Sequence, residues 1–375
     1  MNNTPQIFPS MLGRGGYSYK IAKPIRLIEL FAGIGAQAKA LEKLGVNFEH
    51  YKICEIDKYA CKAYNLIHNT NFETSDISSL HASDLEIADT DKYEYILTYS
   101  FPCTSLSTLG KQQGMVKGSN TASSLLWEVQ RILAECEHKN LPQILLMENI
   151  PQIHSKKNIK QFEEWQAFLV SLGYTNYWQD LSAKDYGVPQ SRNRCFMVSI
   201  LNSPLKYEFP LPFALDKNLQ NLLEDKVDRK YFLSKLMVEC CMSQRNKTFN
   251  RQKIFLDALK QPNLKGVAKT LTTANDKSTS NYIIEEAAIT DKQDNIYNLE
   301  GSSFAALISA FPNFSGNIRI RKLTPKECFR LMGFEDKDFE ILVENKISNT
   351  QLYKMAGNSI VVDVLYYIFK QFFNN

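Results

Sequence analysis

Five short apolar runs, separated by segments with helical spacing, constrain the fold of this chain more than any other feature. They lie at residues 25–30, 50–54, 95–101, 144–147 and 196–201. Short buried strands that alternate with helices are typical of βαβ units around a parallel sheet. The sequence therefore predicts a doubly wound α/β domain that begins at Pro24.

The composition is that of an ordinary globular protein, with 44% hydrophobic residues, 22% charged residues and a formal net charge of +4. The eight cysteines form no CxxC pair and have no histidine at zinc-ligand spacing, so we predict no metal and no disulfide framework. No run approaches the roughly 18 apolar residues of a membrane span, and the first twenty residues lack an apolar signal core. We therefore expect a cytoplasmic protein with no membrane partner.

A change of texture divides the chain. Residues 1–23 are polar and aperiodic, which favours a loosely ordered arm. Between residues 205 and 318 the alternation stops, and Asn, Lys, Ser and Thr surround short aromatic runs. This part is interpreted as a separate insert within one domain made of residues 24–204 and 319–375. Two helices are expected near the end, at 323–332 and 360–373, with Ser359 as the N-cap of the second.

The first chemical signal is a glycine turn. Gly33 and Gly35 follow the first apolar run and precede a helix predicted over 36–44. Glycines let the backbone approach a ligand closely, and a helix N-terminus offers free N–H groups to an anion. Glu55 ends the next run about twenty residues later, where an acceptor for ribose hydroxyls belongs. The pattern favours a nucleotide-like cofactor, although the turn alone could serve tight packing. Asp76 is either an acceptor for an adenine amino group or an exposed turn acid.

The second signal is Cys103, which directly follows the third run in the order Phe-Pro-Cys. A polar stretch with three glycines comes next and extends to Ser124, before a helix expected over 125–133. A cysteine beside such a loop can reach a substrate and be covered when the loop closes. A single cysteine is more often a small buried hydrophobe, so its neighbours decide between these interpretations.

The third signal is Glu148 at the end of the fourth run, followed by Arg192 and Arg194 just before the fifth. Ligands of open parallel sheets bind beyond the carboxyl ends of the strands. Four strands deliver the glycines, Glu55, Cys103 and Glu148 to that edge. If the fifth strand is antiparallel, both arginines lie at the same edge.

These groups suit conjugate addition to an electron-poor heterocycle. The Cys103 thiolate would add to C6 of cytosine, Glu148 would stabilise the charge at N3, and Arg192 and Arg194 would hold the base oxygen, the thiolate and the glutamate. The arginines are expected to lower the pKa of Cys103, and Glu148 is expected to resist ionisation. The cytosine must leave the duplex to reach such a pocket.

Taken together, the motifs resemble those of the bacterial and phage C5-cytosine DNA methyltransferases. The family order is matched over about residues 25–370 by Phe31-Ala-Gly-Ile-Gly35, Pro102-Cys103, Glu148-Asn149, Gln190-x-Arg192-x-Arg194, a segment from Arg319 to Phe334, and Gly357-Asn358-Ser359. The stretch Thr-Tyr-Ser-Phe-Pro-Cys looks most like the compact members, some of which methylate CpG.

This resemblance implies a Rossmann-like domain that binds S-adenosylmethionine and releases S-adenosylhomocysteine, with a small target-recognition domain at 205–318. It assigns to the cofactor Phe31, Gly33, Gly35, Glu55, Ile56, Asp76, Pro102, Leu125, Asn358 and Ser359. It assigns to duplex DNA Thr104, Ser107, Thr270 and Thr272. The chain departs from the family at Thr104, which is usually Gln, and at Ala122-Ser123, which is usually Arg-Gly.

Three other functions are considered. An NAD- or FAD-dependent oxidoreductase would use the same glycine turn and acid, but it leaves Cys103 and the paired arginines unexplained. A non-enzymatic DNA-binding relative is disfavoured because the catalytic side chains are all present. A tRNA-methylating member of the family is the nearest enzymatic alternative. We expect a monomer.

Overall fold

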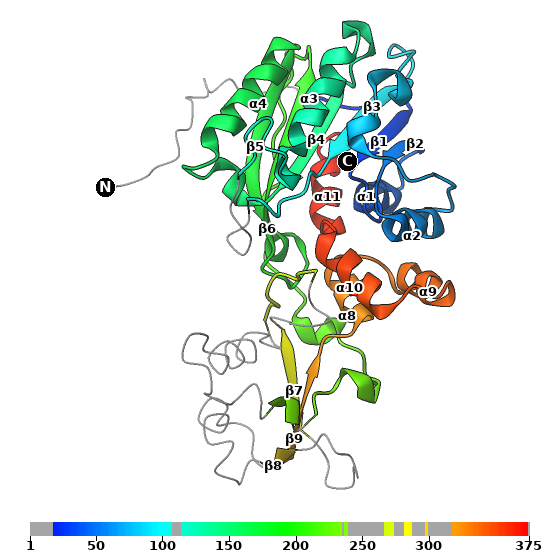
Figure 1. Cartoon of the computed structure of the whole chain (residues 1–375), viewed down its shortest axis with the longest axis vertical. Coiled ribbons are helices and arrows are strands. Elements are labelled where there is room, and N and C mark those ends of the chain that lie inside the picture. The colour runs from blue at the N-terminus through cyan, green and yellow to red at the C-terminus, as the bar shows by residue number, and fades with distance from the viewer. Residues whose placement is uncertain are drawn as a thin grey trace.

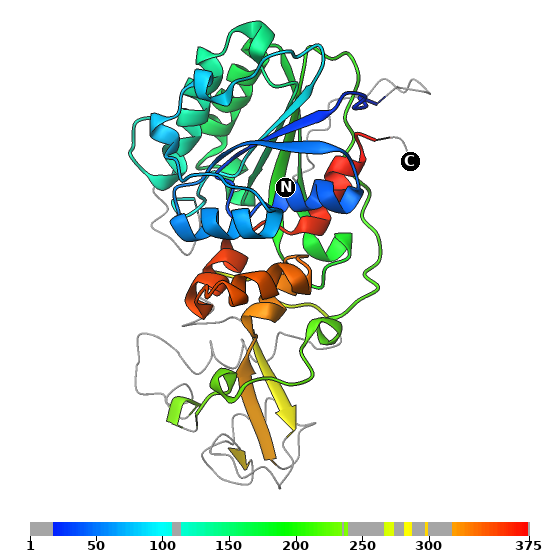
Figure 2. The ribbon, with the colours of Figure 1, turned by 90° about the vertical axis from the view of Figure 1, so that its right-hand side faces the viewer.

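The computed structural model describes residues 18–106, 114–234, 236–238, 266–273, 281–286, 297–298 and 317–373. Figures 1 and 2 show a large sheet with helices on both faces and, beyond a group of C-terminal helices, a small sheet at the opposite end. Among the described residues, no helix combines the length and the apolar character needed to cross a membrane.

The large sheet has six strands in the order β2-β1-β3-β4-β6-β5. Their bounds are β1 Ile25–Leu30, β2 Phe48–Cys54, β3 Glu94–Tyr99, β4 Ile144–Asn149, β5 Tyr174–Ser182 and β6 Asn193–Leu201. The first four are parallel, whereas β6 is antiparallel to both β4 and β5. The α/β prediction is therefore confirmed, and the fifth predicted strand runs in the antiparallel direction on which the shared edge depends.

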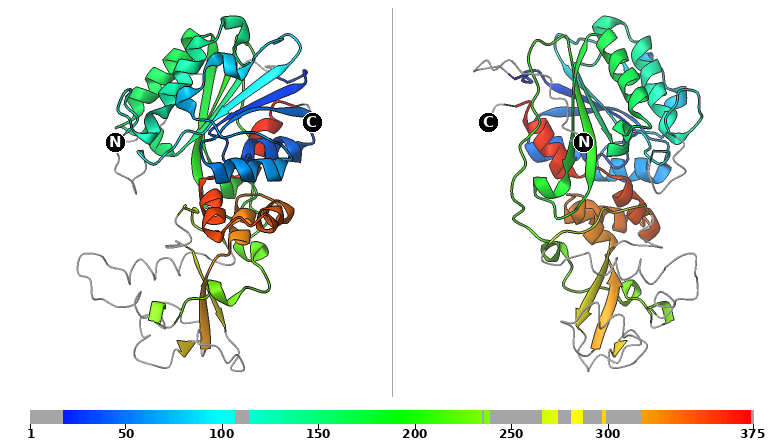
Figure 3. Two further views of the ribbon diagram at one scale, coloured as in Figure 1. Left: turned by 45° about the vertical axis from the view of Figure 1, so that its right-hand side comes forward. Right: turned by 90° about the vertical axis from the view of Figure 1, so that its left-hand side faces the viewer.

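Helices cover both faces of this sheet, each over its own buried core. One face carries α1 Ala36–Leu44, α2 Lys58–His68 and α11 Val362–Lys370, and the other carries α3 Leu126–Glu135 and α4 Ile159–Ser171 (Figure 3). The strands β3 and β4 are buried throughout, because helices pack on both of their sides. Gly45 ends α1 in the left-handed conformation, with φ of 68°.

The C-terminal helices lie between the large sheet and the small one (Figure 1). They are α8 Pro325–Leu331, α9 Asp336–Glu344 and α10 Asn349–Asn358. Thr324 and Glu327 form a capping box at the start of α8. The prediction that Ser359 caps the last helix is wrong: Ser359 ends α10, and Val361 is the N-cap of α11. Ile360 and Val361 lie between Ser359 and the first residue of α11.

The small sheet has the order β7-β9-β8, with β7 Tyr282–Glu286, β8 Tyr297–Asn298 and β9 Asn317–Lys322. Strand β9 crosses the predicted boundary between the insert and the domain, which lies between residues 318 and 319, and it is followed closely by α8. Its Arg321 is buried and bonds Glu327 of α8 through two nitrogens, at 2.9 and 3.0 Å, and Glu285 of β7 at 2.5 Å. Buried charges of this kind are paired because desolvation would otherwise be costly.

Short 3-10 helices complete the described chain: Ile77–Ser79, Ala82–Leu85, Ala122–Leu125, His138–Asn140, Pro151–His154, Ala183–Tyr186, Leu219–Leu222 and Arg229–Tyr231. The end of the predicted N-terminal arm packs on the domain. The backbone N–H of Ile21 donates to the Phe372 carbonyl at 2.9 Å, and Tyr19 donates to the Glu94 carboxylate. The rest of that arm, residues 1–17, lies outside the described residues.

Candidate active site

The predicted site residues meet at the carboxyl edge of the parallel strands. The glycine turn follows β1, Glu55 follows β2, and Cys103 follows β3. Glu148 is the second-to-last residue of β4. Because β6 is antiparallel, it begins at this edge: Glu148 pairs with Phe196, and Asn149 with Cys195. Arg194 thereby comes beside Glu148.

The glycine turn is held by the carboxylate of Glu55. Its Oε2 accepts from the Gly33 N–H at 2.8 Å, and its Oε1 accepts from the Asp57 N–H at 2.8 Å. Gly33 has a φ of 57°, and Phe31 adopts a left-handed φ of 59°, which is uncommon for a side chain of that size. The strand end is therefore kept in a specific conformation by side-chain hydrogen bonds.

Several features of this turn fit a nucleoside-type ligand. Nothing lies within 4 Å of the position that a Cβ on Gly33 would occupy. Ile56 leaves 68% of its surface exposed directly beside Glu55, which is unusual for a large apolar side chain at a strand end. Phe31 and Leu125 are partly exposed and pack against the core on the α3 and α4 side of the sheet. Space, an apolar surface and a carboxylate are thus present together.

Other residues assigned to the cofactor lie around this turn in different states of exposure. Asp76 is exposed and accepts from the Ser78 N–H at 2.9 Å, which lowers its pKa. Asn358 is exposed at the end of α10, whereas Ser359 is buried and its carbonyl accepts from Arg192. Pro102 is partly buried.

Cys103 is partly exposed and lies among charged groups. Burial and the neighbouring Glu148 carboxylate raise its pKa, while Arg194 and Arg192 act in the opposite direction. The arginines thus act on the pKa of Cys103 in the predicted direction, but the net shift in the free protein is upward. The reason is that desolvation and a nearby negative charge outweigh two cations that are partly neutralised by Glu148.

Glu148 is buried and forms an ion pair with Arg194, whose Nε lies 3.0 Å from the Glu148 Oε1. Burial raises the pKa of Glu148, although Arg194 and Arg192 oppose the effect. This direction agrees with the expectation that the carboxyl group resists ionisation.

Arg192 is buried and binds backbone rather than the Glu148 carboxylate. Its terminal nitrogens donate to the carbonyls of Leu271 at 3.2 Å, Gly357 at 3.2 Å and Ser359 at 2.8 Å. Burial and the adjacent Arg194 lower its pKa to about 9. The predicted direct hold on Glu148 is not what the described contacts show, because two of the three guanidinium nitrogens already bind carbonyls of the insert and of α10.

The insert residues assigned to DNA reach this site through the segment 266–273. The backbone of Ala268 exchanges hydrogen bonds with Pro189 and Ser191, each at 2.8 Å. The hydroxyl of Thr270 donates to the Ser191 carbonyl at 3.0 Å. A Cβ on Gly357 would lie only 2.5 Å from the backbone of Thr272 and Thr273. Thr270 and Thr272 are thus fixed near Arg192, which donates to the neighbouring Leu271 carbonyl.

Three residues to which the sequence analysis assigned no contact hold the site together. Ser123, at a position where the resemblance predicts Gly, is buried; it donates to the Pro102 carbonyl at 2.6 Å and accepts from the Ser105 N–H at 3.3 Å. Asn149 donates to the Phe101 carbonyl at 2.9 Å. Gln190 accepts from the Leu271 N–H and donates to the Leu331 carbonyl. The departure of the Ala122-Ser123 pair from the family pattern was the available signal for the first of these.

The remaining predicted DNA contacts lie in the loop after the cysteine. Thr104 is exposed beside Cys103. Ser107 lies outside the described residues. The N–H of Gly114 donates to the Ser105 carbonyl at 3.0 Å, so the described chain on both sides of this gap meets next to Cys103.

An open α/β sheet with a glycine turn and a carboxylate acceptor at its ligand edge defines a Rossmann-like fold that suits a nucleotide-type cofactor. Comparison with known proteins narrows this class. The chain belongs to the C-5 cytosine-specific DNA methylase family, whose model matches residues 25–374. It is therefore an enzyme of the DNA cytosine-5 methyltransferase class, and the family implies S-adenosylmethionine as methyl donor and DNA as substrate.

Curated relatives match over nearly their whole length. The type II methyltransferase M2.ScrFI of Lactococcus lactis subsp. cremoris is 31% identical, and the match covers 94% of this chain and 99% of the relative. The orphan methyltransferase M.SssI of Spiroplasma monobiae is 30% identical, with 92% and 96% covered.

Solved structures share the fold. The Entamoeba histolytica methyltransferase EhMeth superposes with a TM-score of 0.70 at 18% identity, covering 94% of this chain and 98% of that one. The S. pombe Dnmt2 methyltransferase gives a TM-score of 0.64 at 20% identity, covering 92% and 97%.

Proposed function

We propose that the enzyme methylates C5 of a cytosine that has left the DNA duplex, through a transient covalent bond between Cys103 and C6 of the base. The observation that carries this proposal is the position of Cys103: a partly exposed thiol, electrostatically coupled to a buried carboxyl group and two guanidinium groups, at the ligand edge of the sheet.

Cys103 supplies the nucleophile. Its thiolate adds to C6, and the electron pair of the C5–C6 bond moves toward N3 and O2. Burial raises the pKa of Glu148, and in its protonated form Glu148 gives its proton to N3, so no negative charge accumulates on the ring. C5 becomes nucleophilic and is the position that gains the methyl group. Loss of the C5 proton, departure of the thiolate and return of the N3 proton to Glu148 then restore the aromatic ring.

The arginines have separate roles in this mechanism. Arg194 fixes the orientation of the Glu148 carboxyl group through its Nε and stabilises the glutamate when it has lost its proton. Arg192 acts on the thiol and on Glu148 through charge alone, while it holds the backbone of the insert and of α10 in place. Because burial raises the pKa of Cys103, the thiol must release its proton to solvent before it attacks, and the charges of Arg194 and Arg192 favour the thiolate that results.

The turn after β1 would hold S-adenosylmethionine, which supplies an electrophilic methyl group on a sulfonium when it is bound. Gly33 gives the ligand space, Glu55 accepts from ribose hydroxyls, and Ile56 covers an adenine face. Phe31, Gly35, Asp76, Pro102 and Leu125, with Asn358 and Ser359 of α10, complete the surroundings. Asp76, already bound to the Ser78 N–H, offers its second oxygen.

The substrate we propose is a short sequence in duplex DNA, acted on by a monomer in the cytoplasm. Thr270 and Thr272 are fixed near Arg192, and Thr104 is exposed beside Cys103, which supports a role for these residues in contacting the DNA backbone. The part from 205 to 318 is the proposed target-recognition domain.

A trapping experiment tests the covalent step. Duplex DNA containing 5-fluorocytosine cannot lose a C5 proton, so the wild-type chain should remain bonded to it in the presence of cofactor and survive denaturing electrophoresis. Cys103→Ser should give no such adduct and lose nearly all methyl transfer while it still binds the cofactor. Cys136→Ser, a partly buried thiol at the end of α3, is the matched control. An adduct with Cys103→Ser, or equal turnover, would exclude Cys103 as the nucleophile. Offering labelled cofactor with tRNA as well tests the nearest alternative, since label only in RNA would overturn the DNA assignment.

A further inference from the structure

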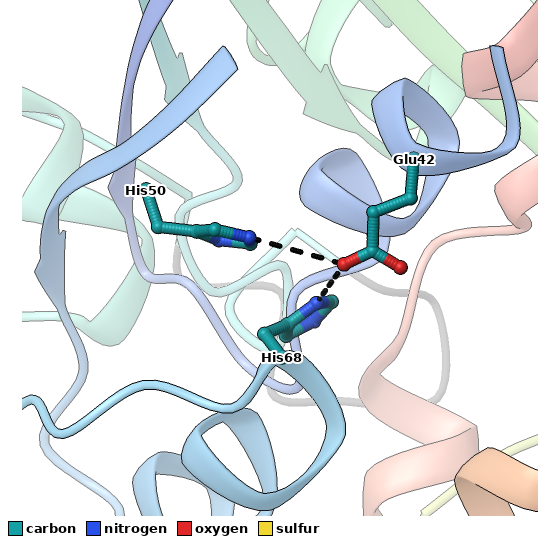
Figure 4. A group of neighbouring side chains, drawn as sticks. All are labelled: Glu42, His50 and His68. Atoms are coloured by element: carbon teal, nitrogen blue, oxygen red, sulfur yellow. Dashed lines mark hydrogen bonds and ion pairs between the residues drawn. The ribbon is translucent and has the colours of Figure 1, made fainter. Parts of the chain in front are cut away.

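Glu42, His50 and His68 gather next to the glycine turn, where His68 contacts the Ile34 carbonyl. They come from α1, β2 and the end of α2, and Figure 4 shows all three side chains pointing toward one another. Glu42 Oε1 lies 2.6 Å from His68 Nδ1 and 3.9 Å from His50 Nε2. One ligand atom from each residue lies within 4.8 Å of the others.

Hydrogen bonds to the far nitrogen of each ring orient both histidines. His50 Nδ1 lies 2.9 Å from the Tyr64 hydroxyl, which itself donates to Glu29 at 2.5 Å, so His50 is the donor and its Nε2 carries a lone pair. His68 Nε2 lies 3.1 Å from the Ile34 carbonyl, which can only accept. In the neutral imidazole, the lone pair of His68 therefore sits on Nδ1, facing the Glu42 carboxylate.

Two lone pairs and a carboxylate that face one point require a cation between them. A proton on His68 Nδ1 satisfies Glu42 and His68, but it leaves His50 Nε2 without a donor at 3.9 Å. A metal ion would satisfy all three atoms. Outer hydrogen bonds from the second ring nitrogen, here to Tyr64 and to a backbone carbonyl, are the usual support of metal-binding histidines.

The surroundings favour a positive charge and allow it to enter. Lys39 is the nearest cation, 3.4 Å from Glu42 Oε2, but it also pairs with Asp338 at 2.8 Å and Glu335 at 3.8 Å. The side chains of Glu42 and His50 are 32% and 19% exposed, whereas that of His68 is fully buried. One side of the cluster thus faces solvent.

We propose that Glu42, His50 and His68 bind a divalent transition metal of the zinc type, with a water molecule in the open position. Two imidazole nitrogens and one carboxylate oxygen form a ligand set suited to Zn²⁺. The metal takes the place of a proton on His68. It joins α1, β2 and α2, the elements that carry the cofactor turn.

The site is in direct contact with that turn. A Cβ on Gly35 would lie 2.2 Å from His68 Nε2, and the same nitrogen donates to Ile34. Ligation at Nδ1 makes Nε2–H a stronger donor, so the metal also stiffens the residues that precede α1. None of the three ligands was predicted from sequence spacing, because each comes from a different element.

Isothermal titration of the full, untagged chain with Zn²⁺, and the visible absorption of bound Co²⁺, test the site. The wild type should bind one ion, and titrations in two buffers of different ionisation enthalpy should show that about one proton is released on binding. His50→Gln and Glu42→Gln should each weaken binding at least about tenfold, and Tyr64→Phe, which removes an outer hydrogen bond, should weaken it by roughly as much. Circular dichroism without metal checks that each variant folds.

Two control variants locate the ion. His81→Gln alters an exposed histidine that pairs with Glu135, and it should bind as the wild type does. His154→Gln removes a ligand from a second cluster, with Asp180 and Cys195, and should also leave the affinity unchanged. Undiminished affinity in His50→Gln, loss of binding in His154→Gln, or no binding by the wild type would each overturn the proposal.

Discussion

Replacing Gly357 by alanine tests how tightly the segment 266–273 is packed against α10. Gly357 lies near the end of α10, with backbone torsions that any residue can adopt. An added Cβ would stand 2.5 Å from the carbonyl carbon of Thr272 and from the nitrogen of Thr273, and 2.6 Å from the Thr272 oxygen. These are backbone atoms, so no side-chain rotation relieves the contact.

The magnitude follows from two opposing effects. Alanine in place of glycine in a helix stabilises it by about 1 kcal/mol. Ordinary contact begins near 3.4 Å, so the segment would have to retreat by about 1 Å, and overpacking of this kind costs about 1–3 kcal/mol. Arg192 and Gln190 hold the neighbouring Leu271, which opposes the retreat. We therefore expect a net loss of up to about 2 kcal/mol, with Thr272 displaced from its position beside Gly357.

Urea unfolding and steady-state kinetics measure the two consequences. Gly357→Ala should unfold at lower urea and show a higher KM for DNA than the wild type. Gly45→Ala is the matched control, because it strains a left-handed glycine in open space and should lower stability by about 1–2 kcal/mol without changing the KM for DNA. A Gly357→Ala protein that is more stable than wild type, with an unchanged KM for DNA, would refute the close contact.

Three further predictions concern other parts of the structure. Ser123→Gly removes the bridge between the Pro102 carbonyl and the Ser105 N–H, two bonds worth about 1 kcal/mol each; single-turnover methyl transfer should slow about tenfold, and an unchanged rate would rule out a positioning role. Because burial and Glu148 raise the pKa of Cys103, its alkylation by iodoacetamide in the free protein should lag behind that of free cysteine at neutral pH and accelerate as the pH rises through that raised pKa; rapid alkylation at pH 7, read by peptide mass spectrometry, would contradict this. Glu327→Ala leaves the buried Arg321 without a major partner and should destabilise the fold by about 3–5 kcal/mol in urea, against less than about 1 kcal/mol for Lys326→Ala at the surface.

Some elements could be predicted to the residue from sequence. The strand Ile25–Leu30 and the helix Ala36–Leu44 match the expected bounds, since a continuous apolar run and a glycine stop are local signals. Strand β5 was missed because it lies at the edge of the sheet, where polar and aromatic residues alternate and several are exposed. Its partner β6 is buried over most of its length and was predicted.

The candidate site also has features that the sequence predicts and features that it does not. Glu148 and Cys103 could be placed at one sheet edge because each ends a strand. The contacts of Arg192 could not be predicted, since they join carbonyls of residues 271, 357 and 359, which are distant in sequence. The direction of the Cys103 pKa depends on how far burial outweighs the arginines, and sequence does not give burial of one thiol.

The packing of α11 against α1 has a consequence for how the chain matures on the ribosome. The core beneath α1 includes Val364, Leu365 and Ile368, which follow the segment 205–318 in the chain. Until they emerge, the nascent N-terminal half carries an uncovered apolar face. The fold on that face of the sheet therefore cannot be completed until the segment 205–318 has been translated.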